Sequence, residues 1–270
     1  MQTITEIQAL LAARGLAPRR KFGQNFLHDH NQLRRLIEAA GVQPGDRVLE
    51  VGPGTGTLTE ALLDVGANVV TCEIDPGLGE LIAERFGDRI ELVRGDCLQR
   101  GRRLSSELVD RLKERPFTLV ANLPYQIASP LMIELLLHHA NCKGQYITIQ
   151  REVADRLLAE PGTKERGPLG ILASTFGTIQ RIANVPASCF WPQPKVVSAM
   201  VSIQPAAAAA PTDGDGYAEF ITGLFSARRK QLGRILGRST PLPEGIDPVW
   251  RPEVLSNEQL VTLFESTRTT

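Results

Sequence analysis

Short runs of β-branched and apolar residues alternate with longer amphipathic stretches from Arg47 onward. The short runs are typical of strands, and stretches such as 58–63 and 131–137 are long and apolar enough to form helices. Strands are expected at residues 48–51, 69–73, 90–93, 117–121 and 146–149. The alternation predicts an α/β fold built on a doubly wound, mostly parallel sheet.

Two further strands are predicted at residues 178–185 and 196–203, with no helical pattern between them. We expect them to pair as antiparallel strands, so that the last strand of the sheet is antiparallel. A Ser129-Pro130 pair predicts a helix start, with serine as the N-cap and proline in the first helical position.

The pattern changes after residue 204, where a low-complexity run with five consecutive alanines extends to residue 216 and is typical of a linker. Beyond it the periodicity is helical only. One helix is predicted by apolar residues at helical spacing, Tyr217, Phe220, Ile221, Leu224 and Phe225. Ser256 and Gln259 form a capping box for another. The expected organisation is an α/β domain at 1–204, a linker at 205–216 and a small helical domain at 217–270.

Residues 1–16 predict an amphipathic helical arm, capped by Thr3 and Glu6. The arm lacks the apolar centre of a signal peptide, and no segment approaches the roughly 18 apolar residues that span a bilayer. We therefore expect a cytoplasmic protein without a membrane partner. The chain has four cysteines, Cys72, Cys97, Cys142 and Cys189. Their spacing is not that of a metal site, so we expect buried reduced thiols and no bound metal.

The charges balance overall, with 30 Lys and Arg against 30 Asp and Glu, which taken alone argues against a nucleic-acid partner. Their distribution is uneven: the net charge is +4 over 1–35, −7 over 36–100, +4 over 101–204 and −1 over 205–270. The last segment also contains a purely basic stretch, Arg228, Arg229, Lys230, Arg234 and Arg238. An ordinary solvated surface is one explanation of each cluster. The other is a polarised molecule that binds an anionic partner on its basic side.

A glycine-rich turn follows the first expected strand, with Gly52, Gly54 and Gly56 directly after Glu50. Glycines between a strand and a helix permit a sharp bend and let a ligand approach the backbone at the helix N-terminus. Glu73 ends the next strand 21 residues after Gly52, the spacing of an acid that binds ribose hydroxyls. These features together indicate an adenosine-containing cofactor.

The dinucleotide fingerprint would require glycine where the chain has Thr57. The pattern present instead resembles the first motif of Rossmann-like methyltransferases that use S-adenosylmethionine. In that class, the position of Asp96 after the third strand contacts the adenine of the cofactor. A simple turn cap is the alternative for Asp96.

The fourth strand ends in Asn122, Leu123, Pro124 and Tyr125, at the sheet edge where open α/β folds bind ligands. This element resembles the motif of methyltransferases that modify planar amino groups. The lone pair of an adenine amine is delocalised into the ring, so hydrogen bonds to the Asn122 oxygen and the Leu123 carbonyl would direct it toward the methyl donor. Pro124 would fix the turn and Tyr125 would stack on the unstacked base. A plain turn with a half-buried tyrosine is the alternative.

Three further motifs accompany this element: Arg-Lys-Phe-Gly-Gln-Asn-Phe-Leu at 20–27, Phe-Trp-Pro-Gln-Pro-Lys-Val at 190–196 and Phe-Ser-Ala-Arg-Arg-Lys at 225–230. In this order, the motifs closely resemble the ribosomal RNA adenine dimethylase family over residues 20–263, in its bacterial small-subunit form. The resemblance implies S-adenosylmethionine as cofactor. The substrate it implies is a pair of adjacent adenosines in the 3′-terminal hairpin loop of small-subunit ribosomal RNA, each methylated twice in a late assembly particle.

The resemblance also implies roles for individual residues. The cofactor would contact Asn25, Leu27, Gly52, Gly54, Glu73, Asp96 and Asn122. Tyr125 and Phe190 would sandwich the target adenine. RNA phosphates would bind the basic residues Arg19, Arg20, Lys21, Lys195, Arg228, Arg229, Lys230 and Arg234. Off the ribosome, the protein is expected to be a monomer.

The chain departs from the family pattern at Gln126 and Ala128, at residues 167–170 and at Val197, which bear on fine substrate positioning rather than on the reaction class. Two alternatives remain open at this stage. One is a related methyltransferase of the antibiotic-resistance type, which modifies a single large-subunit adenosine. The other is a non-catalytic RNA-binding assembly factor with a vestigial methyltransferase fold.

Overall fold

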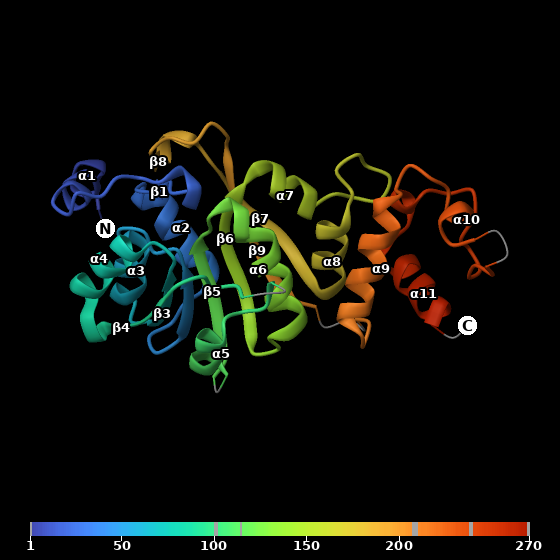
Figure 1. The fold of residues 1–270 in the computed structure, drawn as a ribbon, viewed down its shortest axis with the longest axis horizontal. Coiled ribbons are helices and arrows are strands. Elements are labelled where there is room, and N and C mark those ends of the chain that lie inside the picture. Colours follow the sequence, from blue (N-terminus) through green and yellow to red (C-terminus); the bar gives the residue numbers. More distant parts are fainter. Residues whose placement is uncertain (1, 100–101, 114, 207–209, 238–239, 269–270) are drawn as a thin grey trace. The chain divides into compact units, whose positions relative to one another are not determined.

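The structure is a computed structural model that describes residues 2–99, 102–113, 115–206, 210–237 and 240–268. The chain forms two compact units (Figure 1). The first comprises Met1–Ala154 and Gln180–Gln204, and the second comprises Asp155–Ile179 and Pro205–Thr270. This division differs from the expected one because residues 155–179 cluster with the C-terminal helices rather than with the α/β domain.

A seven-stranded sheet with the order β4-β3-β2-β5-β6-β9-β7 confirms the predicted fold class. The pairs from β4 to β6 are parallel, and β9 is antiparallel to β6. The strands are β2 (Arg47–Val51), β3 (Asn68–Glu73), β4 (Ile90–Arg94), β5 (Phe117–Asn122), β6 (Cys142–Gln150), β7 (Gly177–Val185) and β9 (Ser198–Pro205). A separate antiparallel pair joins β1 (Phe26–Leu27) to β8 (Phe190–Trp191).

In the first unit, α1 precedes the strands and the other helices connect them (Figure 1). They are α1 (Ile4–Ala12), α2 (His30–Ala40), α3 (Thr57–Asp64), α4 (Pro76–Phe86), α5 (Ser106–Leu112) and α6 (Tyr125–His138), with short 3-10 turns at Arg20–Phe22, Gly87–Arg89 and Ala187–Cys189. The start of α4 has a clear local cause: Asp75 accepts a hydrogen bond from the Gly77 N–H and Pro76 occupies the first helical position.

The predicted start of α6 at Ser129 is wrong, because the helix begins one turn earlier at Tyr125. Pro124 precedes it with φ −56°, and Pro130 lies inside the helix. Because proline has no N–H, the helix loses one intrahelical hydrogen bond, to the carbonyl of residue 126. The earlier start places Tyr125 directly at the end of β5.

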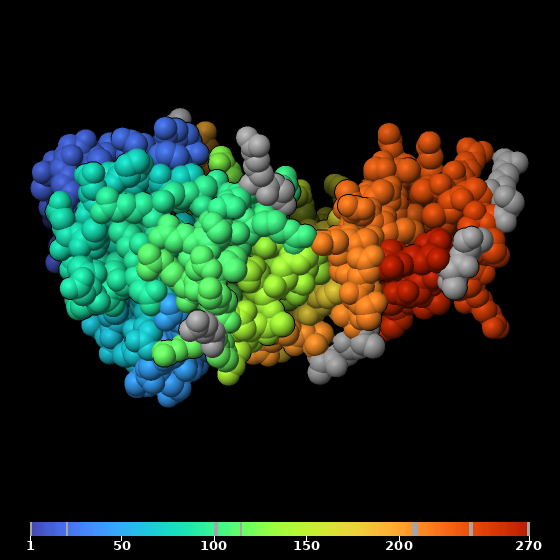
Figure 2. Space-filling model, turned by 60° about the horizontal axis from the view of Figure 1, so that its bottom comes forward, coloured from blue at the N-terminus to red at the C-terminus, as the bar shows by residue number. Residues whose placement is uncertain are grey.

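The N-terminal arm forms the predicted helix, and its capping box is present: the Thr3 side chain accepts from the Glu6 N–H and the Glu6 side chain accepts from the Thr3 N–H. Arg14 forms an ion pair with Glu84 of α4. In the space-filling view, the N-terminal residues (blue) lie directly against the teal residues of α4 (Figure 2). The arm is therefore an integral part of the first unit.

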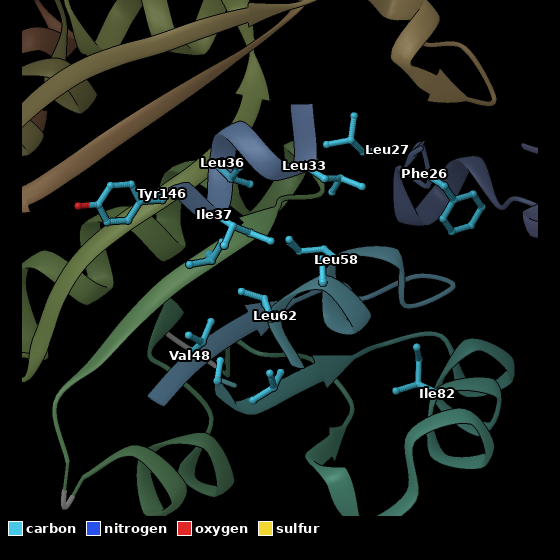
Figure 3. Close-up of a cluster of buried hydrophobic side chains, with 14 of the residues drawn as sticks. Phe26, Leu27, Leu33, Leu36, Ile37, Val48, Leu58, Leu62, Ile82 and Tyr146 are labelled. Carbon is cyan, nitrogen blue, oxygen red and sulfur yellow. The ribbon is translucent and has the colours of Figure 1, made fainter. Parts of the chain in front are cut away.

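The hydrophobic core of the first unit packs the helices α1, α2, α3 and α4 against the sheet. Leu33, Leu36 and Ile37 of α2 face Leu58 and Leu62 of α3 (Figure 3). The same cluster includes Ile7 and Leu11 of α1. The predicted buried thiols are also confirmed, because all four cysteines are free and buried.

The second unit is helical apart from the start of β7. It contains α8 (Pro168–Phe176), α9 (Gly214–Ser226), α10 (Leu232–Ile235), a 3-10 turn at Pro252–Val254 and α11 (Asn257–Arg268), while α7 (Arg151–Leu157) spans the boundary between the units. The predicted linker ends earlier than residue 216, since Asp213 caps α9 through the Gly216 N–H. The capping box of Ser256 and Gln259 is confirmed.

Candidate active site

A cavity of about 290 Å³ opens at the carboxyl ends of the parallel strands, close to the size of small-molecule sites in proteins. Its walls come from the segment before α2 and from the ends of β2, β3, β4 and β5. The lining residues are Leu33, Leu78 and the segments 21–27, 50–55, 57–58, 72–74, 95–97 and 122–127. Every motif that the sequence suggested for the cofactor therefore contributes to one cavity.

The glycine turn between β2 and α3 requires glycine for two reasons. Gly52 and Gly54 have φ of 76° and 62°, in the left-handed region that other residues rarely adopt. A Cβ atom at Gly54 would also lie 2.7 Å from the Phe26 ring, and one at Gly52 would lie 3.3 Å from the Pro124 ring. The turn thus packs closely against the Gln-Asn-Phe-Leu segment through Phe26 and against the Asn-Leu-Pro-Tyr element through Pro124.

Glu73 at the end of β3 orients this turn. Its side chain is only 5 % exposed, and its carboxylate accepts hydrogen bonds from the Gly54 N–H at 3.3 Å and the Asp75 N–H at 2.8 Å. Burial is the main effect on this group and raises its pKa to about 7, against the lowering effect of these hydrogen bonds. Glu73 therefore changes charge within the physiological range.

Asp96 lines the cavity directly after β4, the strand that pairs with β3. One of its carboxylate oxygens accepts from the Leu98 N–H at 3.0 Å, which is the turn cap named as the alternative. Asp96 is also exposed and lines the cavity. The two roles are compatible, because a carboxylate has two oxygens with several acceptor positions.

Asn122 ends β5 and is held by the segment before α2. Its Nδ2 donates to the Asn25 carbonyl at 3.0 Å, and the Asn25 side chain in turn donates to the Gly23 carbonyl at 3.1 Å. Because the amide nitrogen faces a carbonyl, the Asn122 Oδ1 points away from Asn25 and keeps its acceptor capacity. The next residue, Leu123, is anchored by its N–H to the Thr148 carbonyl at 3.2 Å.

Tyr125 begins α6 and lines the cavity with its half-buried ring. The hydroxyl shares a hydrogen bond of 3.0 Å with Ser198 of β9, and burial raises the pKa of the phenol. The ring orientation is thereby fixed from the hydroxyl end, which leaves the ring faces for apolar contacts.

Phe190 does not reach this cavity. Its side chain is 3 % exposed, belongs to the hydrophobic core cluster and is not among the lining residues, whereas its strand partner Leu27 lines the cavity. The neighbouring Trp191 stacks on Phe26 with ring centroids 6.3 Å apart. Phe190 would have to leave the core to contact a base.

The expected RNA-binding residues differ in their surroundings. Arg19 forms an ion pair of 3.4 Å with the buried Asp75. Lys21 is exposed with its ammonium over the Phe22 ring, Arg228 is half-buried and donates to the Lys164 carbonyl, and the side chains of Arg20 and residue 238 lie outside the described part of the chain. The others are exposed: Lys195, Arg229, Lys230 and Arg234. Residues 228–230 form a turn after α9 rather than part of a helix.

The sequence did not reveal that Asp75 and Glu50 are buried at the site, or that the Gln24 side chain binds Asp75. Asp75 accepts from the Gln24 side chain at 3.0 Å, so the glutamine of the Gly-Gln-Asn-Phe-Leu motif fixes the turn after β3. Glu50 is 1 % exposed and accepts from the Thr59 hydroxyl at 2.6 Å, and burial raises its pKa to about 8. Only an apolar neighbourhood in sequence, Val48 to Val51, hinted at the burial of Glu50.

A glycine turn after the first parallel strand, an acid at the end of the second and a polar motif at the end of the fourth define a Rossmann-like methyltransferase site. The family described as "Ribosomal RNA adenine dimethylase" matches residues 15–266. The chain belongs to the ribosomal RNA adenine dimethylase family, as its motifs suggested.

Curated relatives are similar over nearly the whole chain. "Ribosomal RNA small subunit methyltransferase A" of Nocardia farcinica is 39 % identical, over 96 % of this chain and 92 % of the relative. The protein of the same name from Corynebacterium diphtheriae is 37 % identical, over 97 % and 94 %.

Two solved structures are also similar to this chain. A dimethyladenosine transferase from Plasmodium falciparum has a TM-score of 0.74 and 26 % identity, over 90 % of this chain and 98 % of that one. The 23S rRNA methyltransferase ErmE has a TM-score of 0.66 and 25 % identity, over 90 % and 99 %. Their methyltransferase fold implies use of S-adenosylmethionine.

The buried Glu50 generates a prediction about stability. Its pKa is near 4.5 when unfolded and about 8 when folded, so between these values the folded state binds the extra proton and the free energy of unfolding falls as pH rises. Glu50→Gln should flatten this decline between pH 5.5 and 8, measured by urea unfolding, and leave the smaller slope of Glu73. Glu38→Gln, at an exposed position of α2, is the control. Parallel pH profiles of wild type and Glu50→Gln would contradict the assignment.

Proposed function

We propose that this protein dimethylates the N6 amines of two adjacent adenosines in the 3′-terminal hairpin loop of small-subunit ribosomal RNA. The methyl donor is S-adenosylmethionine, and the substrate is a late small-subunit assembly particle. The observation that carries the proposal is the Asn122 amide, held by the Asn25 carbonyl with its oxygen turned away, beside the glycine-turn cavity.

The polar groups that line the cavity fit S-adenosylmethionine. Glu73 offers a carboxylate for the ribose hydroxyls, Asp96 offers an acceptor for the adenine amine, and the backbone of Gly52 and Gly54 permits close approach of the methionine part. Asn25 and Leu27 complete the wall. When bound, the cofactor supplies an electrophilic methyl group on a sulfonium.

The residues at the end of β5 prepare the adenine amine. The Asn122 Oδ1 and the Leu123 carbonyl accept its two N–H groups, which opposes delocalisation of the lone pair into the ring. In the described residues, no backbone N–H competes for the Leu123 carbonyl. Tyr125 provides a face for the flipped base, and stacking is assigned to this ring alone because Phe190 is in the core. Catalysis by this arrangement rests on orientation rather than on a strong base.

The choice of small-subunit over large-subunit RNA rests on the relatives. Proteins named for the small subunit share 36–39 % identity with this chain, whereas the large-subunit enzyme ErmE shares 25 %. The proposal includes a monomer in the cytoplasm that binds RNA phosphates through exposed basic residues, among them Lys195, Arg229 and Lys230. None of the helices in the described segments has the length and apolar composition needed to cross a membrane.

The direct test uses labelled S-adenosylmethionine and purified subunits that lack the adenosine methylation. Label should enter small-subunit RNA and appear as N6,N6-dimethyladenosine at two adjacent positions. Labelling of large-subunit RNA would favour the antibiotic-resistance type of activity. No labelling by a protein that binds the cofactor would favour a non-catalytic assembly factor. Either result would overturn the proposal.

Asn122→Ala should reduce the rate of methyl transfer by roughly 10² to 10³-fold, as expected when one positioned hydrogen-bonding group is lost from a transition state. RNA affinity should stay within about twofold of wild type, since the flipped base is the one part of the RNA that Asn122 would contact. Single-turnover transfer and filter binding measure the two quantities. Asn184→Ala, an exposed asparagine outside the cavity, should leave both unchanged. A transfer rate in Asn122→Ala equal to wild type would refute the amine-positioning role.

Glu73 predicts the pH dependence of cofactor binding. Ribose hydroxyls donate more strongly to an ionised carboxylate, and burial raises the pKa of Glu73 to about 7. The affinity for S-adenosylmethionine should therefore rise from pH 6 to pH 8 and then level off, in calorimetric titrations. Glu73→Gln should bind more weakly and lose most of this dependence. The same pH dependence in Glu73→Gln would assign it to another group.

A further inference from the structure

Gln2 is a buried polar residue at the start of the N-terminal arm, and its side chain is only 4 % exposed. Its Nε2 donates to the Thr55 carbonyl at 2.9 Å, and its Oε1 accepts from the Thr57 hydroxyl at 3.1 Å. Thr55 belongs to the glycine turn and Thr57 is the first residue of α3; both line the cavity, whereas Gln2 does not line it. One amide group outside the cavity lining therefore binds both the glycine turn and the first residue of α3.

The backbone of Gln2 also reaches the other wall of the site. Its carbonyl lies 3.2 Å from Nε2 of His30, the first residue of α2. His30 follows closely after residues 21–27, which line the cavity and include Asn25 and Leu27. Gln2 thus connects two segments, distant in sequence, that face the cofactor in the proposed function.

The arm is anchored firmly enough to set the position of Gln2. Ile7 and Leu11 are buried in the core cluster of the first unit, and Arg14 pairs with Glu84. Leu16 lies so close to Gly77 of α4 that a Cβ atom on this glycine would be 2.6 Å from its Cδ2. These contacts fix the arm on the same helices that carry the cofactor-facing turns.

We infer that Gln2 is a positioning residue for S-adenosylmethionine, acting through the glycine turn; this inference rests on the proposed function. A turn rich in glycine has many accessible conformations, so holding it in one conformation requires external hydrogen bonds. Loss of the Gln2 amide removes the acceptor of Thr57 and one donor to Thr55. Arg85 also donates to the Thr55 carbonyl, which keeps this carbonyl paired and lets the variant fold.

The test compares Gln2→Met with Gln8→Met. The first substitution keeps the side-chain length and removes both polar atoms, and the second makes the same change on the exposed side of α1. Calorimetry should show S-adenosylmethionine binding weakened about three- to tenfold in Gln2→Met, the range for one or two buried hydrogen bonds, and unchanged in Gln8→Met. The KM for the cofactor should rise by the same factor, while kcat at saturation and RNA affinity stay within about twofold.

A purely structural role would give a different result: a lower melting temperature of Gln2→Met with unchanged cofactor affinity at 15 °C. That result overturns the inference, as does a loss of kcat without a change in KM. If wild type itself binds no S-adenosylmethionine, the proposed function fails, and the inference fails with it; if wild type binds and Gln2→Met binds equally, only the inference fails.

Linkage supplies a readout independent of activity. If the arm stabilises the cofactor-binding form of the turn, the cofactor must stabilise the docked arm by the same factor. Saturating S-adenosylhomocysteine should therefore slow trypsin cleavage after Arg14, followed by mass spectrometry, about three- to tenfold in wild type and in Gln8→Met. The protection should be lost in Gln2→Met. Equal protection in all three proteins would overturn the inference.

Discussion

The hydrogen bond from Asn122 to the Asn25 carbonyl is the interaction on which the site depends. It joins two residues 97 positions apart and decides which way the Asn122 amide faces, since only the nitrogen can donate to a carbonyl. A reversed amide would present a donor to the adenine amine and repel it. The parallel sheet makes this bond possible by ending β5 at the edge where the segment before α2 passes.

On the cofactor side of the cavity, side-chain hydrogen bonds likewise fix the position of the glycine-turn backbone. Glu73 accepts a hydrogen bond from the Gly54 N–H at the end of β3, and the side chains of Gln2 and Arg85 both donate to the Thr55 carbonyl. Glu50 and Glu73 are two buried carboxyl groups in this region, and burial raises the pKa of both. Binding and stability are thereby coupled to pH in opposite directions: stability falls as these groups ionise, while the ionised Glu73 is the better ribose acceptor.

The glycine turn, Glu73, Asp96 and the Asn-Leu-Pro-Tyr element line one cavity because each lies at the end of a predicted strand, and parallel strands bring their carboxyl ends together. Three features were not accessible in this way. Phe190 is buried through its pairing with Leu27, a tertiary contact that no local pattern reveals. Gln2 acts across 53 residues and belongs to no motif, and residues 155–179 join the second unit through packing rather than through composition. The neutral net charge was likewise uninformative until the charges were divided by segment.

The central claim is that a single cavity holds the methyl donor and presents it to the Asn122 oxygen. A crystal structure with S-adenosylhomocysteine tests this most directly. We expect the ribose hydroxyls on Glu73, the adenine beside Asp96 and the sulfur directed toward Asn122, with the Asn122 nitrogen still on the Asn25 carbonyl. A ligand bound elsewhere, or an Asn122 amide turned with its nitrogen toward the sulfur, would contradict it.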